Sequence, residues 1–378
     1  MDYSASPFIE ISLPPAYILP LPTLLSIYAC LAYVDLFLLR HDHTSIRLLM
    51  ACIHVLVPMV FISNNPPLNV LIAATPWFLA TYSAHMPVHD LTPWKWIKAF
   101  LQIIVDKDNA PTHDTIIRLK GLQKMALGVL KISFLHVFVN PLLPSHAKDA
   151  LAYPWYHSMS CIYTVLFGIK GYCMLGVVDF FIGVEQTIFA WHLVSLFNSP
   201  MLASSPRDFW SRRWNRVVRN LLHTQVFTKK AKTSLHKRKK SITVIDQPPN
   251  RRITRSITAA AVANAHVHAH VHTAVAVQDI ENRTFWSTKK GRGLLTFIIS
   301  GIFHELIIMS ACRKITLENF MFFTLQGVAV MIEVGVRQGP LKREPKGKTR
   351  LLCIGLQLLF MSITGRLFNG PFLRYDFF

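Results

Sequence analysis

Long apolar runs without charged side chains constrain this chain more than any other feature. Three of them cover residues 11–34, 150–169 and 186–206. The hydrocarbon core of a bilayer is about 30 Å thick, so a helix of roughly 20 apolar residues spans it. Only 16% of the 378 residues are charged, whereas a soluble domain usually has about 25%. The sequence therefore predicts an all-α, polytopic transmembrane helical protein.

About eight membrane spans are expected, and at least one of the candidate segments only dips into the membrane. The candidates lie near residues 14–39, 47–63, 68–85, 123–144, 154–177, 179–199, 293–312, 317–337 and 350–369. The first segment is too long and too rich in proline for a cleaved signal peptide, so we interpret it as a retained anchor. The six cysteines fall mostly in apolar segments without a CxxC pair, and we interpret them as small buried side chains.

Positive charge is concentrated in one region of the chain. The formal net charge is +20, and residues 207–292 contain 19 Lys and Arg against 4 Asp and Glu. Basic loops of membrane proteins tend to stay in the cytoplasm, which predicts a cytosolic loop here. The basic run 229–240 has no nucleic-acid-binding pattern and no aromatic platform, so nucleic acid is not an expected partner. A solvated face that touches anionic lipid is favoured instead.

Residues 229–278 are expected to form a basic, low-complexity cytosolic insertion in a single membrane domain, 1–378. Four histidines in this insertion alternate with small apolar residues: His266, His268, His270 and His272. On a strand they would share one face and could ligate a metal. A linker is favoured, because nothing nearby supplies an ordered second shell for a metal. We therefore predict no metal site.

The stretch SPRDFWSRRWNRVVRN, residues 205–220, predicts a helix that begins with Ser205 as N-cap, Pro206 in the first position and Asp208 in the third. Apolar side chains then recur on one helical face: Trp210, Trp214, Val217, Val218 and Leu221. Basic side chains lie on the opposite face: Arg212, Arg216 and Arg219. This amphipathic pattern suits the membrane interface, where indole rings lie among the headgroups.

Two uses of this basic face remain open from the residues alone. The arginines can simply extend from an interfacial helix towards water. Alternatively, they can bind the phosphates of an anionic cosubstrate, because a guanidinium group matches phosphate oxygens in a bidentate manner.

A second informative stretch is FIISGIFHELIIMS, residues 297–310, where His304 and Glu305 interrupt an apolar span. Ionisable groups at membrane depth are costly and generally mark functional sites. The alternative is that His304 only forms a hydrogen bond to a neighbouring helix. Ser300 and Gly301, one turn earlier, allow a neighbouring chain or ligand to approach closely.

Together these two stretches carry a resemblance to a known family. The paired signature of the membrane-bound O-acyltransferase superfamily resembles two segments of this chain, FNSPMLASSPRDFWSRRWNRVVRN and, further on, FIISGIFHELI. The patterns SxxDFWxRRWN and SGxxHE are similar to those of its wax-synthase-like branch, known from plant wax ester synthases and fungal natural-product acetyltransferases. The resemblance covers about residues 195–220 and 293–312 and is looser over the final spans. The region 229–278 departs from the family pattern.

The resemblance implies transfer of an acyl group from acyl-CoA to an alcohol without an acyl-enzyme intermediate. It implies His304 as the general base, a role suited to an imidazole because its pKa lies near neutrality. It implies Asn215 as a residue that orients the reactants or donates a hydrogen bond to the oxyanion. The residues expected at the acyl-CoA are Arg212, Arg213, Arg216, Trp210 and Trp214. Acyl-CoA is a cosubstrate here, and no bound cofactor is expected.

The expected function is acetyl transfer from acetyl-CoA to a hydroxyl of a lipophilic, terpenoid-type metabolite. One alternative is a long-chain-alcohol or sterol O-fatty-acyltransferase, which has the same motifs and a different pocket. Another is a transporter in which His304 relays protons or packs, although transporters often contain internal repeats and the two halves show none. The expected partners are acyl-CoA, a lipophilic alcohol and membrane lipids. We expect a multi-pass protein of the endoplasmic reticulum.

Overall fold

A computed structural model of the chain describes residues 6–39, 43–66, 68–70, 72–74, 79, 92–101, 104–106, 111, 113–220, 285–337 and 345–375. The chain divides into two units. The first consists of Met1–Leu222 with Phe297–Phe378, and the second is His223–Thr296. The predicted insertion 229–278, with its four alternating histidines, lies outside the described residues.

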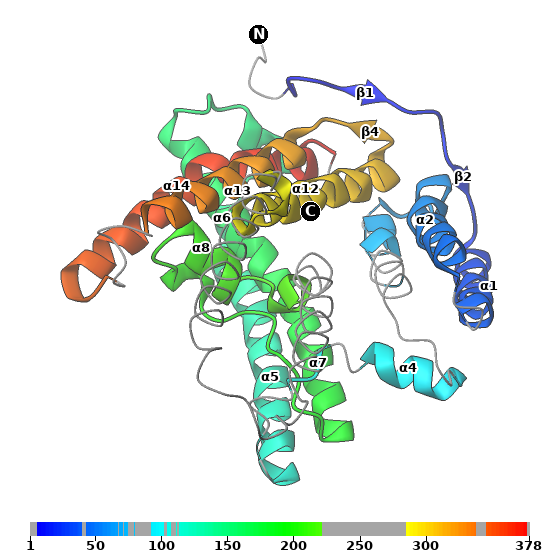
Figure 1. Cartoon of the computed structure of the whole chain (residues 1–378). Helices are drawn as coiled ribbons and strands as arrows, with labels where there is room; N and C mark the ends of the chain where they lie inside the picture. The colour runs from blue at the N-terminus through cyan, green and yellow to red at the C-terminus, as the bar shows by residue number, and fades with distance from the viewer. Residues whose placement is uncertain are drawn as a thin grey trace, which may run out of the picture. The chain divides into compact units, whose positions relative to one another are not determined.

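Helices make up most of the described chain, which confirms the all-α prediction (Figure 1). The α-helices are α1 (Leu21–Leu39), α2 (Thr44–Val60), α4 (Pro93–Leu101), α5 (Asp114–Phe134), α6 (Ser158–Met174), α7 (Gly176–Phe189), α8 (Pro206–Asp208), α12 (Lys289–Cys312), α13 (Glu318–Val336) and α14 (Gly347–Arg374). Short π and 3-10 turns are η2 (Leu135–Val139), η3 (Asn140–Leu142), η4 (Ala147–Leu151), η5 (Pro200–Leu202), η6 (Phe209–Arg213) and η7 (Phe285–Ser287). The strands have two residues each: β1 (Ile11–Ser12), β2 (Tyr17–Ile18), β3 (Phe61–Ile62) and β4 (Lys314–Ile315).

Six helical stretches of the described chain are long and apolar enough to cross a membrane: Leu21–Leu38, Asp114–Leu142, Ser158–Phe189, Lys290–Cys312, Glu318–Val336 and Gly347–Arg374. Helix α2 is apolar and shorter. These stretches make the chain a multi-pass membrane protein. The two spans predicted at 154–177 and 179–199 form one helical stretch, Ser158–Phe189, in which Leu175 alone separates α6 from α7. The second span was predicted to extend ten residues too far. Helix α7 ends at Phe189, where Ala190 adopts the left-handed conformation with φ 52°.

The apolar residues after α7 form an extended segment rather than the end of a span. Leu193 and Leu196 in this segment are almost fully buried. The Leu193 N–H donates to Oε1 of the buried Gln186 at 3.2 Å, and the Lys124 ammonium donates to the Leu193 carbonyl at 2.6 Å. Side chains of α5 and α7, together with backbone hydrogen bonds to residues 104–106, replace the helical hydrogen bonds that this segment lacks.

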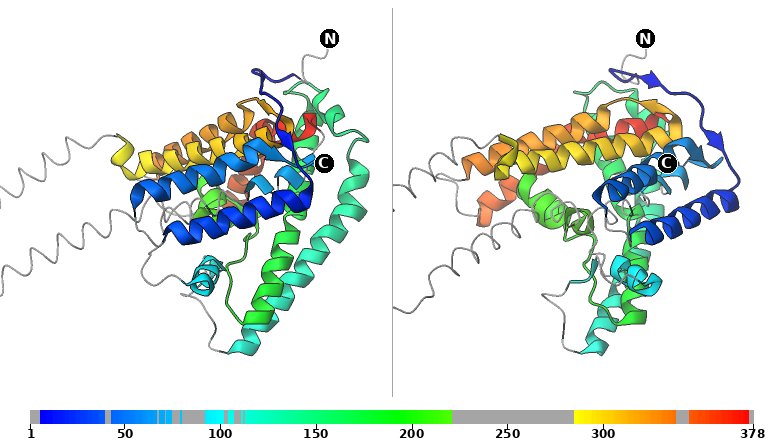
Figure 2. Two further views of the ribbon diagram at one scale, coloured as in Figure 1. Left: turned by 90° about the vertical axis from the view of Figure 1, so that its right-hand side faces the viewer. Right: turned by 45° about the vertical axis from the view of Figure 1, so that its right-hand side comes forward.

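Helices α5 and α7 lie side by side along their length because small residues let their backbones meet (Figures 1 and 2). A Cβ atom on Gly121 would lie 2.9 Å from the carbonyl oxygen of Gly183. A Cβ atom on Gly128 would lie 2.6 Å from that of Gly176. The buried ion pair Lys131–Asp179, with 2.6 Å between Nζ and Oδ2, joins the same two helices.

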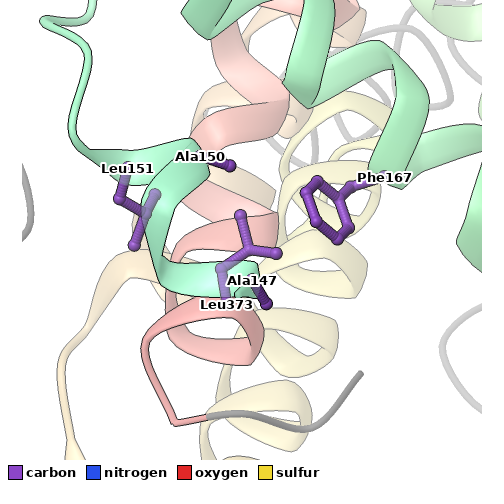
Figure 3. Close-up of a cluster of buried hydrophobic side chains, with 5 residues drawn as sticks. All are labelled: Ala147, Ala150, Leu151, Phe167 and Leu373. Atoms are coloured by element: carbon purple, nitrogen blue, oxygen red, sulfur yellow. The ribbon is translucent and has the colours of Figure 1, made fainter. Parts of the chain in front are cut away.

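The C-terminal end of α14 packs onto the segment that precedes α6. Figure 3 shows the apolar cluster at this contact, formed by Ala147, Ala150, Leu151, Phe167 and Leu373. The buried Arg366 of α14 donates to the carbonyl of Tyr153 at 2.7 Å, to that of Leu151 at 2.9 Å and to the Ser160 hydroxyl. One guanidinium group thus satisfies carbonyl oxygens that the short turn η4 leaves without helical partners.

The outer faces of the spanning helices carry exposed apolar side chains, among them Leu130 and Leu351. The six cysteines are free. Our interpretation of them as buried holds for Cys173 and is wrong for Cys30 and Cys52, which are exposed on α1 and α2. An apolar side chain on a membrane helix can face lipid, so its composition does not predict burial against protein.

Two short ladders hold the N-terminal segment. Strand β1 pairs antiparallel with β4, and β2 pairs parallel with β3. Next to β1, the Glu10 carboxylate forms an ion pair with Lys314 and accepts a 3.1 Å hydrogen bond from the Tyr375 hydroxyl. The hydrogen bond from Lys314 is the main cause of a lowered pKa of Glu10; burial acts in the opposite direction and Tyr375 lowers the pKa further.

This lowered pKa predicts a pH-dependent contribution to stability. Because the folded pKa of Glu10 lies below the unfolded value of about 4.3, its contribution is present above that value and is lost as pH falls through the folded pKa. We expect Glu10→Gln to lower the melting temperature in detergent near neutral pH. The difference from the wild type should shrink as the pH falls through the folded pKa. A difference that is independent of pH would contradict this assignment.

Candidate active site

His304 lies within α12 with one ring nitrogen already bonded. Its Nδ1 is 2.7 Å from the carbonyl oxygen of Ser300, one turn earlier. A carbonyl oxygen only accepts, so Nδ1 carries the hydrogen, and Nε2 of the neutral ring is left as an acceptor. The ring packs against Phe323 of α13 and Phe368 of α14, with centroid distances of 4.4 Å and 5.6 Å. The imidazole is therefore oriented by its own helix and by two neighbours.

Glu305, the other half of the His-Glu pair, binds the start of α13. Its Oε1 accepts from the backbone N–H groups of Asn319 at 2.8 Å and Phe320 at 3.2 Å. Its Oε2 accepts from the Thr316 N–H at 3.4 Å. A carboxylate at a helix N-terminus satisfies N–H groups that have no helical partner and interacts favourably with the helix dipole. Glu305 therefore fixes the start of α13 beside His304.

Gly301 allows this close approach of the two helices. A Cβ atom at this position would lie 3.0 Å from the Cα of Phe320. The neighbouring chain expected near Ser300 and Gly301 is thus helix α13 of the same protein.

The first motif begins as predicted and then departs from the prediction. The Ser205 hydroxyl accepts from the Asp208 N–H at 3.1 Å, and Pro206 occupies the first turn of α8. The predicted continuous amphipathic helix over 205–220 is wrong. The chain leaves the helix after η6, and Asn215 is left-handed with φ 38°.

Asn215 starts the next helical segment, 216–220. Its side-chain Oδ1 accepts from the Val218 N–H at 3.2 Å, as an N-cap does. Asparagine tolerates the left-handed region and competes for backbone hydrogen bonds, which accounts for the break. Because Oδ1 is the cap acceptor, the amide Nδ2 remains available as a donor.

Both tryptophans of the motif are half-buried and pack against other aromatic rings. Trp214 stacks on Phe209 with an interplanar angle of 16° and lies 4.8 Å from the Phe197 ring. Trp210 contacts the rings of α12 and α13 and lies 5.6 Å from Phe323. Since Phe323 also contacts the His304 ring, the structure brings Trp210 and His304 against one shared aromatic side chain.

The arginines of the motif divide by their partners. Arg213 binds Asp208 at 2.8 Å and the carbonyls of Asn198 and Ser199 at 3.3 Å and 3.1 Å. These bonds hold the turn around η6 together. Arg212 is exposed, and Arg216 is half-buried with no side-chain hydrogen bond to the described residues. Arg216 is thus the arginine whose guanidinium group is best placed to meet an anion.

Several residues of this site were not predicted from the sequence. Phe323, Phe368 and Gln326 surround His304 and Trp210, and only Gln326 gives a signal, as a polar amide within an apolar span. Among the described residues, Asn215 and His304 form no hydrogen bond with each other. The described part of the chain also contains no cluster of three or more His, Cys, Asp or Glu that could hold a metal.

The fold and the two motifs define a polytopic helical membrane protein with an oriented histidine at its interior. Residues 193–288 match the model of the membrane bound O-acyl transferase family. This part of the chain is thus similar to that family, and the similar proteins are named as long-chain-alcohol O-fatty-acyltransferases.

Similar proteins come from plants. "Probable long-chain-alcohol O-fatty-acyltransferase 1" of Arabidopsis thaliana is 26% identical over 269 residues, which cover 71% of this chain and 62% of the relative. "Probable long-chain-alcohol O-fatty-acyltransferase 2" of the same plant is 26% identical over 57% of this chain and 49% of its own. "Long-chain-alcohol O-fatty-acyltransferase" of Simmondsia chinensis is 26% identical over 49% and 43%, respectively. The matched region thus spans less than two thirds of each of these relatives.

The position of Glu305 generates a prediction about stability. Glu305→Ala removes the acceptor for the N–H groups of Asn319 and Phe320, each of which would cost about 1–3 kcal/mol if left unpaired in the interior. We expect a strong loss of folded protein and of melting temperature. Glu305→Gln retains one oxygen acceptor and should lose much less. Equal losses in both variants would contradict the capping role.

Proposed function

We propose that this protein is an acyl-CoA-dependent O-acyltransferase that acylates a lipophilic alcohol. The observation that carries the proposal is the hydrogen bond between His304 Nδ1 and the Ser300 carbonyl. It leaves Nε2 of the neutral ring as a base at membrane depth, where an alcohol dissolved in the bilayer can reach it. The match of residues 193–288 to the membrane bound O-acyl transferase family supports the same reaction class.

In the proposed reaction, the alcohol oxygen attacks the thioester carbonyl carbon while its proton passes to Nε2 of His304. The Ser300 carbonyl stabilises the imidazolium through the Nδ1–H group. The free Nδ2 of Asn215 is the donor proposed for the carbonyl oxygen as it gains negative charge. The carbon–sulfur bond then breaks, the ester forms, and the CoA thiolate takes the proton from the imidazolium. The thioester is already activated, so no acyl-enzyme is required.

Arg216 and Arg212 are the proposed contacts of the CoA phosphates, because guanidinium groups bind phosphate oxygens in a bidentate manner. Arg213 contributes indirectly, through the turn that it holds. Trp210 and Trp214 shape the wall between this basic region and His304. The proposed membrane is the endoplasmic reticulum, with the basic loop in the cytosol, where acyl-CoA is available.

The identities of the acyl donor and the acceptor alcohol are the second part of the proposal. Resemblance to fungal natural-product acetyltransferases supports acetyl-CoA and a terpenoid-type hydroxyl. The names of the plant relatives favour a second candidate, a fatty acyl donor and a long-chain alcohol. Both reactions use the same base and differ in the space that the acyl chain and the alcohol must occupy.

Replacing His304 tests the proposed reaction. General-base catalysis contributes about 10²–10⁴-fold, so His304→Ala should reduce ester formation in microsomes to below a hundredth of the wild-type rate. His136→Ala is the matched control, because His136 is another histidine within a spanning segment and lies far along the chain from both motifs. More than about a tenth of the activity left in His304→Ala would refute the base assignment.

The same microsomes distinguish the donors. Wild-type protein is given equal amounts of acetyl-CoA and palmitoyl-CoA with either a terpenoid alcohol or hexadecanol, and the esters are measured by mass spectrometry. Acetyl esters that depend on His304 would support the first candidate, and palmitoyl esters the second. The absence of any His304-dependent ester would refute the acyltransferase proposal for these substrates and leave the transporter alternative.

Asn215 and Arg216 should differ in their kinetic effects. Asn215→Ala removes a transition-state donor and should lower kcat by about 10²–10³-fold, with little change in the KM for acyl-CoA. Arg216→Ala removes a ground-state contact and should raise that KM, with an effect that depends on salt. Arg213→Ala serves as comparison and should reduce folded yield instead. Saturation curves normalised to folded protein provide the measurement; parallel losses of yield with normal kinetics in all three variants would contradict these roles.

A further inference from the structure

Gln326 is a fully buried amide in the middle of the apolar helix α13, and both ends of its side chain are bonded. Its Oε1 accepts from Trp210 Nε1 at 3.0 Å. Its Nε2 donates to Thr364 Oγ1 of α14 at 3.0 Å. The Thr364 hydroxyl in turn donates to the carbonyl of Phe360 at 2.8 Å. This row of hydrogen bonds connects the first motif to two spanning helices.

Trp210 is the member of this row that reaches towards His304. Its ring lies 5.7 Å from that of Phe297, 6.2 Å from Phe322 and 5.6 Å from Phe323. Phe323 then contacts the His304 ring at 4.4 Å. Any rotation of the indole changes the space available to Phe323, and so the surface against which the imidazole rests.

Ring packing alone does not fix this arrangement. Contacts between aromatic rings are worth only about 0.5–1.5 kcal/mol per pair beyond their buried area, and they allow several geometries. The indole N–H is directional, and a buried donor without a partner is costly, so the bond to Gln326 selects one orientation of Trp210. Thr364 holds the amide of Gln326 in the flip that presents its oxygen to Trp210.

We propose that Gln326 is a positioning residue: by holding Trp210 against Phe323, it fixes the orientation of the His304 imidazole. The proposal rests on the proposed function in one respect, namely that His304 is the base. It assigns to the first motif a mechanical role in the reaction, beside its proposed contact with acyl-CoA. The link runs from Gln326 through Trp210 and Phe323 to His304.

The test uses Gln326→Leu, Trp210→Phe and the double variant in the full-length protein. Trp210→Phe retains an aromatic ring and removes the indole N–H. Small misplacements of a catalytic group cost up to about 10²-fold in rate, and we expect each single variant to lower kcat about tenfold with the KM for acyl-CoA unchanged. The double variant should be no slower than the slower single variant, because both changes remove the same bond.

Gln357→Leu is the matched control. Gln357 is buried in α14, and its amide atoms form no hydrogen bond with the described residues. The substitution therefore makes the same chemical change in a similar interior without touching Trp210. It should leave kcat, normalised to folded protein, unchanged.

A second readout does not depend on acyl transfer. Diethyl pyrocarbonate modifies unprotonated imidazoles, and peptide mass spectrometry measures the rate at His304 separately. If Gln326 orients the side chains beside the imidazole, the rate of His304 modification should change several-fold in Gln326→Leu and Trp210→Phe. It should remain at the wild-type value in Gln357→Leu. His304 modification at the wild-type rate in the first two variants would overturn the proposal, whether or not the protein shows acyltransferase activity.

The remaining outcomes separate this inference from the proposed function. Full activity in Gln326→Leu, with none in His304→Ala, would overturn the positioning role and leave the base assignment standing. Activity retained in His304→Ala would refute the base, and the modification rates alone would then decide whether Gln326 orients the ring. A raised KM for acyl-CoA with unchanged kcat in Trp210→Phe would mean that Trp210 only contacts acyl-CoA. That result would also overturn the positioning role.

Discussion

The contact between Glu305 and the first turn of α13 determines the geometry of the candidate site. The first N–H groups of a helix have no helical partner, and leaving such a group buried and unpaired is costly. The Glu305 carboxylate accepts from Asn319 and Phe320 and so fixes where α13 starts. Its sequence neighbour His304 then faces the second turn of α13, where Phe323 meets the ring. In the His-Glu pair, Glu305 thus positions a helix, and His304 is the residue proposed to react.

The parts of the structure that depend on local chemistry were predictable from the sequence. The apolar runs indicated the spanning helices, and the Ser-Pro-x-Asp pattern located the start of α8, because caps and hydropathy act over a few residues. The extended segment after α7 was not predictable, since Leu193 and Leu196 have the same composition as a span and only Gln186 and Lys124 show otherwise. The break at Asn215 and the contact of Gln326 with Trp210 also depend on partners distant in the sequence.

Several polar side chains of this protein hold backbone that is not helical. Arg366 binds carbonyls before α6, Arg213 binds carbonyls before α8, and Gln186 binds the extended segment. A soluble protein could leave such groups to water, whereas a membrane protein must supply a side chain for each. This requirement explains why one arginine of the RRWN sequence serves the turn itself. The charges that remain for a cosubstrate are fewer than the composition of the motif indicates.

The glycine contacts between α5 and α7 fix the register of these two helices along their axes. Gly121 faces Gly183 and Gly128 faces Gly176, so the spacing of seven residues on one helix is matched by seven on the other. Sliding one helix by a heptad, about 10 Å at 1.5 Å per residue, would keep one glycine pair and bring the other glycines against side chains. Only one register of the two helices therefore brings both glycine pairs together. Because Gln186 of α7 and Lys124 of α5 both bind the extended segment after α7, this register also fixes the position of that segment against the two helices.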